Sequence, residues 1–121
     1  MPHPANRLNT IRVVKGQTQV ITVTVKTQDG AASSVVGTNL YFTAQDDKGT
    51  VVIAKLSTDG IVVKDGPGGI FTVTLTSTDT ELAPGRYRYD IWVEFPVSPP
   101  VRNPVVKAAD MIIEDAITQF A

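Results

Sequence analysis

Few residues in this chain could carry acid–base or nucleophilic chemistry. The only histidine, His3, lies between two prolines near the start, and there is no cysteine. Catalysis of these kinds depends most often on a histidine or a thiol whose pKa can be tuned. A serine triad would lack a histidine on the body of the domain, and a zinc site would lack a ligand set. We therefore expect no enzyme activity and no bound cofactor or metal.

Several aspartates lie in or beside predicted turns, and they leave two interpretations open. Oxygen ligands grouped at one end of a fold can bind Ca²⁺. Aspartate is also an ordinary turn residue, because its carboxylate accepts hydrogen bonds from nearby backbone N–H groups. No alternating Asp-x-Asp spacing typical of calcium loops is present, which favours the turn interpretation. The aspartates concerned are Asp29, Asp46, Asp47, Asp59, Asp65 and Asp79.

The composition indicates one globular domain that binds neither nucleic acid nor membrane. A chain of 121 residues with 42% hydrophobic residues is long and apolar enough to bury one core. The net charge of −1 and the scattered lysines and arginines argue against a nucleic-acid-binding face. The apolar runs are too short for a membrane span, and the N-terminal residues lack the apolar core of a signal peptide.

Alternation of apolar and polar residues recurs along the chain and predicts β-strands. The expected strands cover residues 8–14, 17–26, 39–45, 50–57, 61–63, 70–76, 86–95 and 105–114. Seven to eight short, mostly antiparallel strands separated by turns are typical of an immunoglobulin-like β-sandwich. A small barrel is the alternative fold.

The strongest local signal is the turn at residues 82–87, Leu-Ala-Pro-Gly-Arg-Tyr, which leads directly into an alternating strand. This is the sequence form of a tyrosine corner, in which the tyrosine hydroxyl bonds back to the loop that it has just left. Before it, residues 77–82 are predicted as one helical turn capped by Ser77 or Thr78. After the strand, the prolines of residues 96–104 predict an exposed extended loop. We expect an N-terminal arm at 1–7, the sandwich at 8–114 and a C-terminal tail at 115–121.

Possible interaction residues lie on the strand after the corner, in the proline loop and in the tail. If Tyr87 and its alternate neighbours face the core, the charged residues and the single tryptophan of this strand face outward, and Trp and Arg are enriched at interface hot spots. Alternatively, a loop or the proline segment covers the tryptophan. Asp90 and Glu94 suit a glycosidase pair and plain solvated charges equally well. The candidate interface residues are Arg88, Trp92, Glu94, Pro99, Pro100, Ile117 and Phe120.

The order of these motifs resembles a known family. The motifs are the segment 37–44 (Gly-Thr-Asn-Leu-Tyr-Phe-Thr-Ala), the Asp-Asp-Lys-Gly hairpin at 46–49, Lys-Leu-Ser-Thr-Asp-Gly-Ile at 55–61, Phe-Thr-Val-Thr-Leu-Thr at 71–76 and the corner region 79–91. Together they are similar to the immunoglobulin-like N-terminal domain of upper baseplate proteins from tailed bacteriophages. The similarity extends over about residues 15–114.

The resemblance implies a structural protein of the virion, assembled in the cytoplasm of the bacterial host. In the family this domain fastens receptor-binding machinery to the tail, but no helical stem follows it in this sequence. We therefore expect an adaptor on tail or baseplate subunits, with a decoration (cement) protein on the major capsid protein as the alternative. Several copies in a symmetric assembly are expected. A carbohydrate-binding module, using Trp92 and Tyr41, is a second alternative from another functional class.

Overall fold

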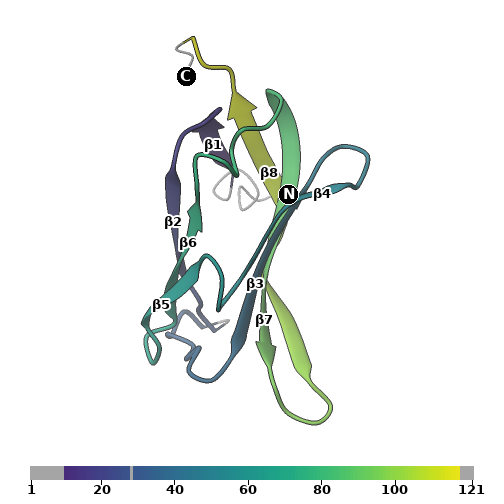
Figure 1. Ribbon diagram of the computed structural model, residues 1–121. Coiled ribbons are helices and arrows are strands. Elements are labelled where there is room, and N and C mark those ends of the chain that lie inside the picture. The colour runs from purple at the N-terminus through teal and green to yellow at the C-terminus, as the bar shows by residue number, and fades with distance from the viewer. Residues whose placement is uncertain (1–9, 28, 118–121) are drawn as a thin grey trace.

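The computed structural model describes residues 10–27 and 29–117, which form two β-sheets packed face to face (Figure 1). The strands are β1 (Ile11–Val14), β2 (Gln19–Thr24), β3 (Asn39–Gln45), β4 (Val51–Leu56), β5 (Ile61–Asp65), β6 (Ile70–Leu75), β7 (Gly85–Phe95) and β8 (Val101–Glu114). No helix occurs in these two stretches, and so none could cross a membrane.

The strand order is that of an immunoglobulin-like sandwich. The larger sheet has the order β1-β8-β7-β3-β4, and the smaller sheet has the order β2-β6-β5. All pairs are antiparallel except β1 with β8, which is parallel. The sequence-based prediction of the fold is thus confirmed. Because the two sheets stay separate rather than closing on each other, the barrel alternative is excluded.

The core lies between the sheets and follows from the alternation of the strands. Inward-facing positions carry large apolar side chains with no exposed surface, including Leu40 and Phe42 of β3 and Phe71 of β6. The rings of Phe42 and Tyr89 stack with their centroids 5.3 Å apart, which joins β3 to β7 inside the larger sheet. Burial of these side chains supplies the main free energy that holds the two sheets together.

The tyrosine corner is present. The hydroxyl of Tyr87 donates a hydrogen bond of 2.7 Å to the carbonyl oxygen of Ala83, four residues earlier. Tyr87 is itself buried at the start of β7. The bond therefore ties the loop between β6 and β7 to the strand that follows it.

The single turn predicted at residues 77–82 is present but does not continue as a helix, and the prediction of its cap was wrong. The Thr80 N–H donates to the Thr76 carbonyl oxygen at 3.2 Å, which closes one turn of the helical type, and Thr76 rather than Ser77 or Thr78 caps it. The Thr76 N–H donates to Asp79 Oδ2 at 2.8 Å, and the Asp79 N–H donates to Thr76 Oγ1 at 3.2 Å. The buried Thr80 hydroxyl donates 2.7 Å to the Gln17 carbonyl oxygen, which fixes the turn to the β1–β2 connection. These side-chain bonds hold the backbone without a helical repeat.

The prediction that the proline segment 96–104 stays outside the sheet was wrong in its last part. Strand β8 already begins at Val101 and includes Pro104, which pairs with Trp92 of β7. Proline is tolerated there because β1 covers the other edge of β8 only from Met111 onward, so Pro104 needs no second partner strand. The register of β7 and β8 also shifts beside Trp92, and such irregularities accommodate proline.

The remaining boundaries agree closely with the sequence. β3 covers the expected residues, β5 is longer than expected, and β2 is shorter. The expected arm at 1–7 lies outside the described residues, as does the last part of the tail. Figure 1 shows the described chain leaving the sandwich beyond the tip of β8.

Candidate interaction surfaces

Strand β7 divides its side chains between the core and the outer face of the larger sheet. Tyr87, Tyr89, Ile91 and Val93 are buried, whereas Arg88 is exposed. Because side chains alternate along a strand, the even-numbered residues of β7 point outward. The outward positions are Arg86, Arg88, Asp90, Trp92 and Glu94, as the sequence predicts.

Register brings Trp92 into an apolar row that crosses the outer face. Trp92 pairs with Tyr41 of β3 on one side and with Pro104 of β8 on the other, and Tyr41 pairs in turn with Leu56 of β4. Paired residues on neighbouring strands place their side chains side by side on one face. We call these four residues, Leu56, Tyr41, Trp92 and Pro104, the apolar row.

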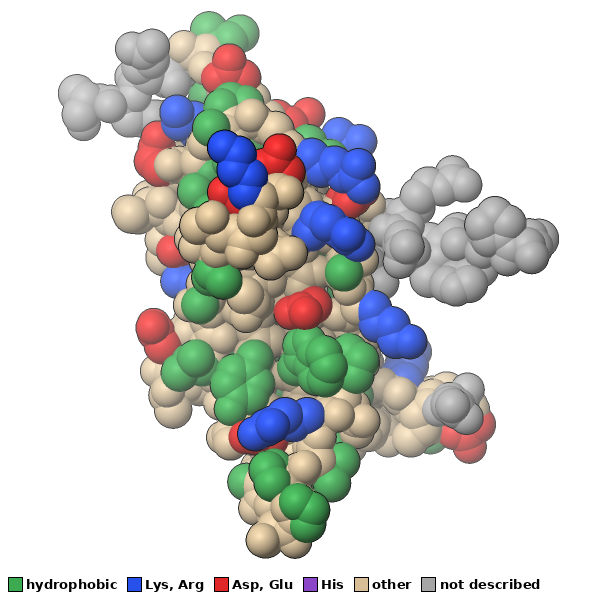
Figure 2. Space-filling view, turned by 90° about the vertical axis from the view of Figure 1, so that its right-hand side faces the viewer, with side chains coloured by type: hydrophobic (Ala, Val, Ile, Leu, Met, Phe, Trp, Pro, Cys, Tyr) green, Lys and Arg blue, Asp and Glu red, His purple; other side chains and the backbone are tan. Residues whose placement is uncertain are grey.

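The side chains of the apolar row pack beside one another and are partly exposed to solvent. Trp92, Tyr41 and Pro104 are half-buried, and Leu56 is 42% exposed. Figure 2, which looks onto this side of the molecule, shows hydrophobic side chains in a band across its lower half, with an acidic side chain above and a basic one below. Both sequence-based interpretations of Trp92 thus hold in part. Trp92 lies on the outer face, and Pro104 of the proline segment lies beside it.

A network of polar side chains borders the apolar row and is centred on Glu94. Its Oε2 pairs with Arg102 Nε at 2.6 Å, and its Oε1 accepts from Asn39 Nδ2 at 2.9 Å and from the Tyr41 hydroxyl at 3.2 Å. These hydrogen bonds, with Asn39 and then Arg102 contributing most, lower the pKa of Glu94 below its ordinary value. Glu94 is therefore charged at neutral pH and holds Tyr41 in place beside Trp92.

The other predicted interface residues do not join this surface. Arg88 lies further along β7, where its guanidinium donates to the Ala108 carbonyl oxygen at 3.4 Å. Pro99 and Pro100 are exposed in the β7–β8 connection. Ile117 lies beyond β8 and is fully exposed, and Phe120 lies outside the described residues. The predicted set therefore falls on several separate surfaces.

Among the turn aspartates, Asp46, Asp65 and Asp79 accept hydrogen bonds from backbone N–H groups, as the turn interpretation predicts. Asp46 Oδ1 accepts from the N–H groups of Lys48 and Thr50, both at 2.9 Å, and Asp65 Oδ1 accepts from Gly68 at 3.0 Å. Among the residues that the structure describes, no three His, Cys, Asp or Glu side chains come together as metal ligands would.

Sequence reasoning missed an ion pair that joins β4 to the loop between β6 and β7. Lys55 of β4 pairs with Phe42, a core residue, and so starts on the inner face. Its Nζ reaches Asp79 Oδ2 at 2.8 Å, with only 13% of the lysine side chain and 20% of the aspartate side chain exposed. Burial alone would raise the pKa of Asp79, but Lys55 and Thr76 together bring it below its ordinary value. A lysine at an inward position of a strand is the one signal that could have indicated this pair.

Two comparisons with known proteins found no similar protein. No protein-family model matches the chain, and no curated protein matches it significantly. The chemistry of the surface is therefore the basis for a functional assignment. Next to the apolar row, the outer face offers the hydrogen-bonded carboxylate of Glu94 and the exposed guanidinium of Arg102, a combination that suits recognition of another molecule.

Proposed function

We propose that this protein is a non-catalytic structural component of a tailed-bacteriophage virion, where it acts as an adaptor on tail or baseplate subunits. The immunoglobulin-like fold and the motif similarity to upper baseplate domains support the assignment. Such a module works by burying part of its surface against neighbouring subunits.

The observation that carries the proposal is the apolar row with its border of polar side chains. Trp92 and Tyr41 supply large contact area, and the Arg102 side chain is 63% exposed at the rim. Aromatic residues surrounded by polar groups are the usual centre of a protein interface. The outer face of the larger sheet is thus the docking face in this proposal.

The decisive experiment is a cryo-electron-microscopy reconstruction of the virion whose genome encodes the chain. Copies on the tail or baseplate, with the apolar row against a neighbour, are the expected result. Copies on the head would instead support the alternative of a capsid decoration protein. Absence of the protein from the virion would refute both.

The binding face is tested separately with purified tail subunits. Arg102→Glu reverses an exposed charge at the rim and is expected to weaken binding strongly. Val62→Glu on β5 is the control, because Val62 is 52% exposed on the other sheet. Equal binding by both variants would show that the outer face of the larger sheet is not the docking face.

A carbohydrate-binding module remains the second candidate, because the structure places Tyr41 directly beside Trp92. Aromatic rings in a row can stack on sugar rings, and Asn39, Glu94 and Arg102 offer hydrogen-bonding groups next to them. Glycan-array binding that is lost in Trp92→Ala, with the fold of the variant verified by circular dichroism, would favour this candidate. No binding across the array would leave the adaptor function.

A further inference from the structure

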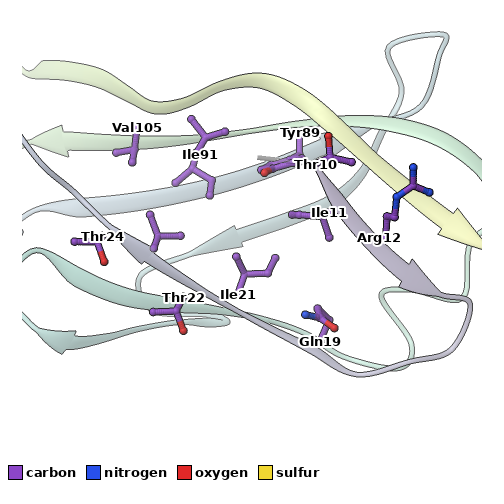
Figure 3. Close-up of a pocket in the computed structure, with 12 residues that line it drawn as sticks. Thr10, Ile11, Arg12, Gln19, Ile21, Thr22, Thr24, Tyr89, Ile91 and Val105 are labelled. Carbon is purple, nitrogen blue, oxygen red and sulfur yellow. The ribbon is translucent and has the colours of Figure 1, made fainter. Parts of the chain in front are cut away.

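The hairpin of β7 and β8 extends beyond the core at the lower end of the molecule (Figure 1). Figure 3 shows Ile91 of β7 pointing across the gap between the sheets toward Ile21 of β2. Two residues further along β7, Val93 is still buried, but Phe95 is only half-buried. Packing between the two sheets therefore ends at Phe95. We call the residues that follow it, 96–101, the hairpin tip.

The hairpin tip exposes apolar side chains and carries no charge. Its sequence is Pro-Val-Ser-Pro-Pro-Val, in which Ser98 has the only polar side chain. All six residues are exposed, and the exposed fractions of Val97 and Val101 are 57% and 47%. Both ends of the described chain lie at the other end of β8, because β1 pairs with β8 only from Met111 onward, about 33 Å along the strand from Val101. An exposed apolar patch of this kind indicates an interaction site.

The main chain of the hairpin tip is also suited to burial. Three of its six residues are prolines, which have no N–H group. The Val97 N–H donates to the Phe95 carbonyl oxygen at 2.8 Å. Of residues 96–100, only Ser98 keeps a main-chain N–H that no described residue accepts. Because an unsatisfied N–H is costly to bury, the scarcity of such groups lowers the cost of removing the tip from water.

The polar groups that remain on the hairpin tip are mainly hydrogen-bond acceptors. The carbonyl oxygens of residues 96–100 accept no main-chain hydrogen bond from a described residue. Hydrocarbon has no donors for them, so the interior of a lipid bilayer does not suit the tip. The complementary surface is apolar and supplies N–H or O–H groups. Tryptophan and tyrosine side chains combine these properties, and proline-rich segments commonly bind in aromatic-lined grooves.

We propose that the hairpin tip inserts into an uncharged, aromatic-lined pocket of the tail or baseplate subunit on which the protein docks. The inference rests on the proposed function and adds a second contact to it. Arg102 at the rim of the docking face directly follows the tip, and Figure 2 shows hydrophobic side chains at the lower end of the molecule, below the basic side chain. One partner therefore contacts both the tip and the apolar row. The prolines restrict the free tip, which reduces the conformational entropy lost on binding.

The first test measures the binding of Val97 variants to purified tail subunits. Val97→Asp and Val97→Lys are each expected to weaken binding about tenfold or more, because an apolar pocket excludes a charge of either sign. Val36→Asp is the matched control and is expected to bind like the wild type, since Val36 is a 66% exposed valine in another loop. Weakening by only one sign of charge would show electrostatic attraction instead of insertion and would overturn the proposal.

The second test uses the absence of cysteine from the chain, which makes a single introduced thiol a specific probe. Cysteine is smaller than valine, so Val97→Cys still fits the pocket. Its thiol is expected to react with N-ethylmaleimide at least about fivefold more slowly in the complex than in the free protein, because the complex buries it. Val36→Cys should react equally fast in both states. A thiol at position 97 that stays fully reactive in the complex would refute insertion.

The outcomes separate this inference from the proposed function. If Arg102→Glu weakens binding while Val97→Asp and Val97→Lys do not, the docking face stands and the tip contact is refuted. If the wild type does not bind tail subunits, both are refuted. Vesicles of phosphatidylcholine and phosphatidylglycerol test lipid as the occupant, and no binding to them is expected. Vesicle binding that Val97→Asp abolishes would replace the protein pocket with a membrane.

Discussion

Substitution of Gly69 by alanine tests how the loop between β5 and β6 closes the sandwich. Gly69 is buried with a φ of +73°, and a Cβ built there would lie 2.3 Å from the Ser33 carbonyl oxygen and 2.8 Å from that of Val25. Both neighbours are backbone atoms, so relief requires the chain itself to move. The Val25 N–H donates to the Gly69 carbonyl oxygen at 2.8 Å, and the Ser33 N–H donates to that of Val25 at 3.0 Å.

The expected loss follows from strain, crowding and broken hydrogen bonds. A left-handed conformation costs an alanine about 1–2 kcal/mol. Overpacking of a buried site costs about 1–3 kcal/mol, and each weakened hydrogen bond costs about 1 kcal/mol. We expect Gly69→Ala to lower the free energy of unfolding by about 4 kcal/mol, which is a large part of the stability of a domain of this size.

Gly49→Ala is the matched control, because Gly49 has a φ of +86° but nothing within 4 Å of the added Cβ. It should cost only the conformational strain, about 1 kcal/mol. Urea unfolding is followed by the fluorescence of Trp92, the single tryptophan, and extrapolated linearly to water. Equal losses in the two variants would refute the reasoning, because the close approach of Val25 and Ser33 would then have no energetic effect.

Two further predictions concern side-chain hydrogen bonds. Tyr87→Phe removes the hydrogen bond to Ala83 and should lower the free energy of unfolding by about 1 kcal/mol and Tm by about 4 °C. The control Tyr41→Phe, on the outer face, should lower the free energy of unfolding by less than about 0.5 kcal/mol. Equal losses of the two variants in calorimetry would contradict a structural role of the corner. The pKa of Glu94 is lower folded than unfolded, so its stabilisation is present above the ordinary value of 4.5 and is lost as the pH falls through the folded pKa. The urea concentration at the unfolding midpoint should therefore fall less from neutral to acidic pH in Glu94→Gln than in the wild type. An equal fall in both proteins would disprove the link between the pKa of Glu94 and stability.

Local patterns predicted much of the fold. The alternation in residues 39–45 predicted the bounds of β3, and the Asp-Asp-Lys-Gly sequence predicted a hairpin, in which Gly49 has a positive φ. The Pro-Gly-Arg-Tyr sequence gave the corner. These features depend on side chains within a few residues of one another, so sequence reasoning can find them.

The candidate site was predicted only in part, because it depends on contacts between distant segments. Outward exposure of Trp92 follows from alternation, but its neighbours Tyr41 and Pro104 follow from the register of three strands. The error at Pro104 has the same origin, since proline is acceptable only where the partner strand ends. The Lys55–Asp79 pair joins β4 to a loop 24 residues later and has no local pattern.

The amino-acid sequence alone determined the strand periodicity, the turns and the type of residue available on each strand face. The tertiary structure decided which strands are neighbours and in what register they pair, and therefore where the apolar row lies. The physical reason is that alternation specifies the two faces of a strand, whereas pairing depends on the packing of the whole core and on main-chain hydrogen bonds that are the same for nearly every residue.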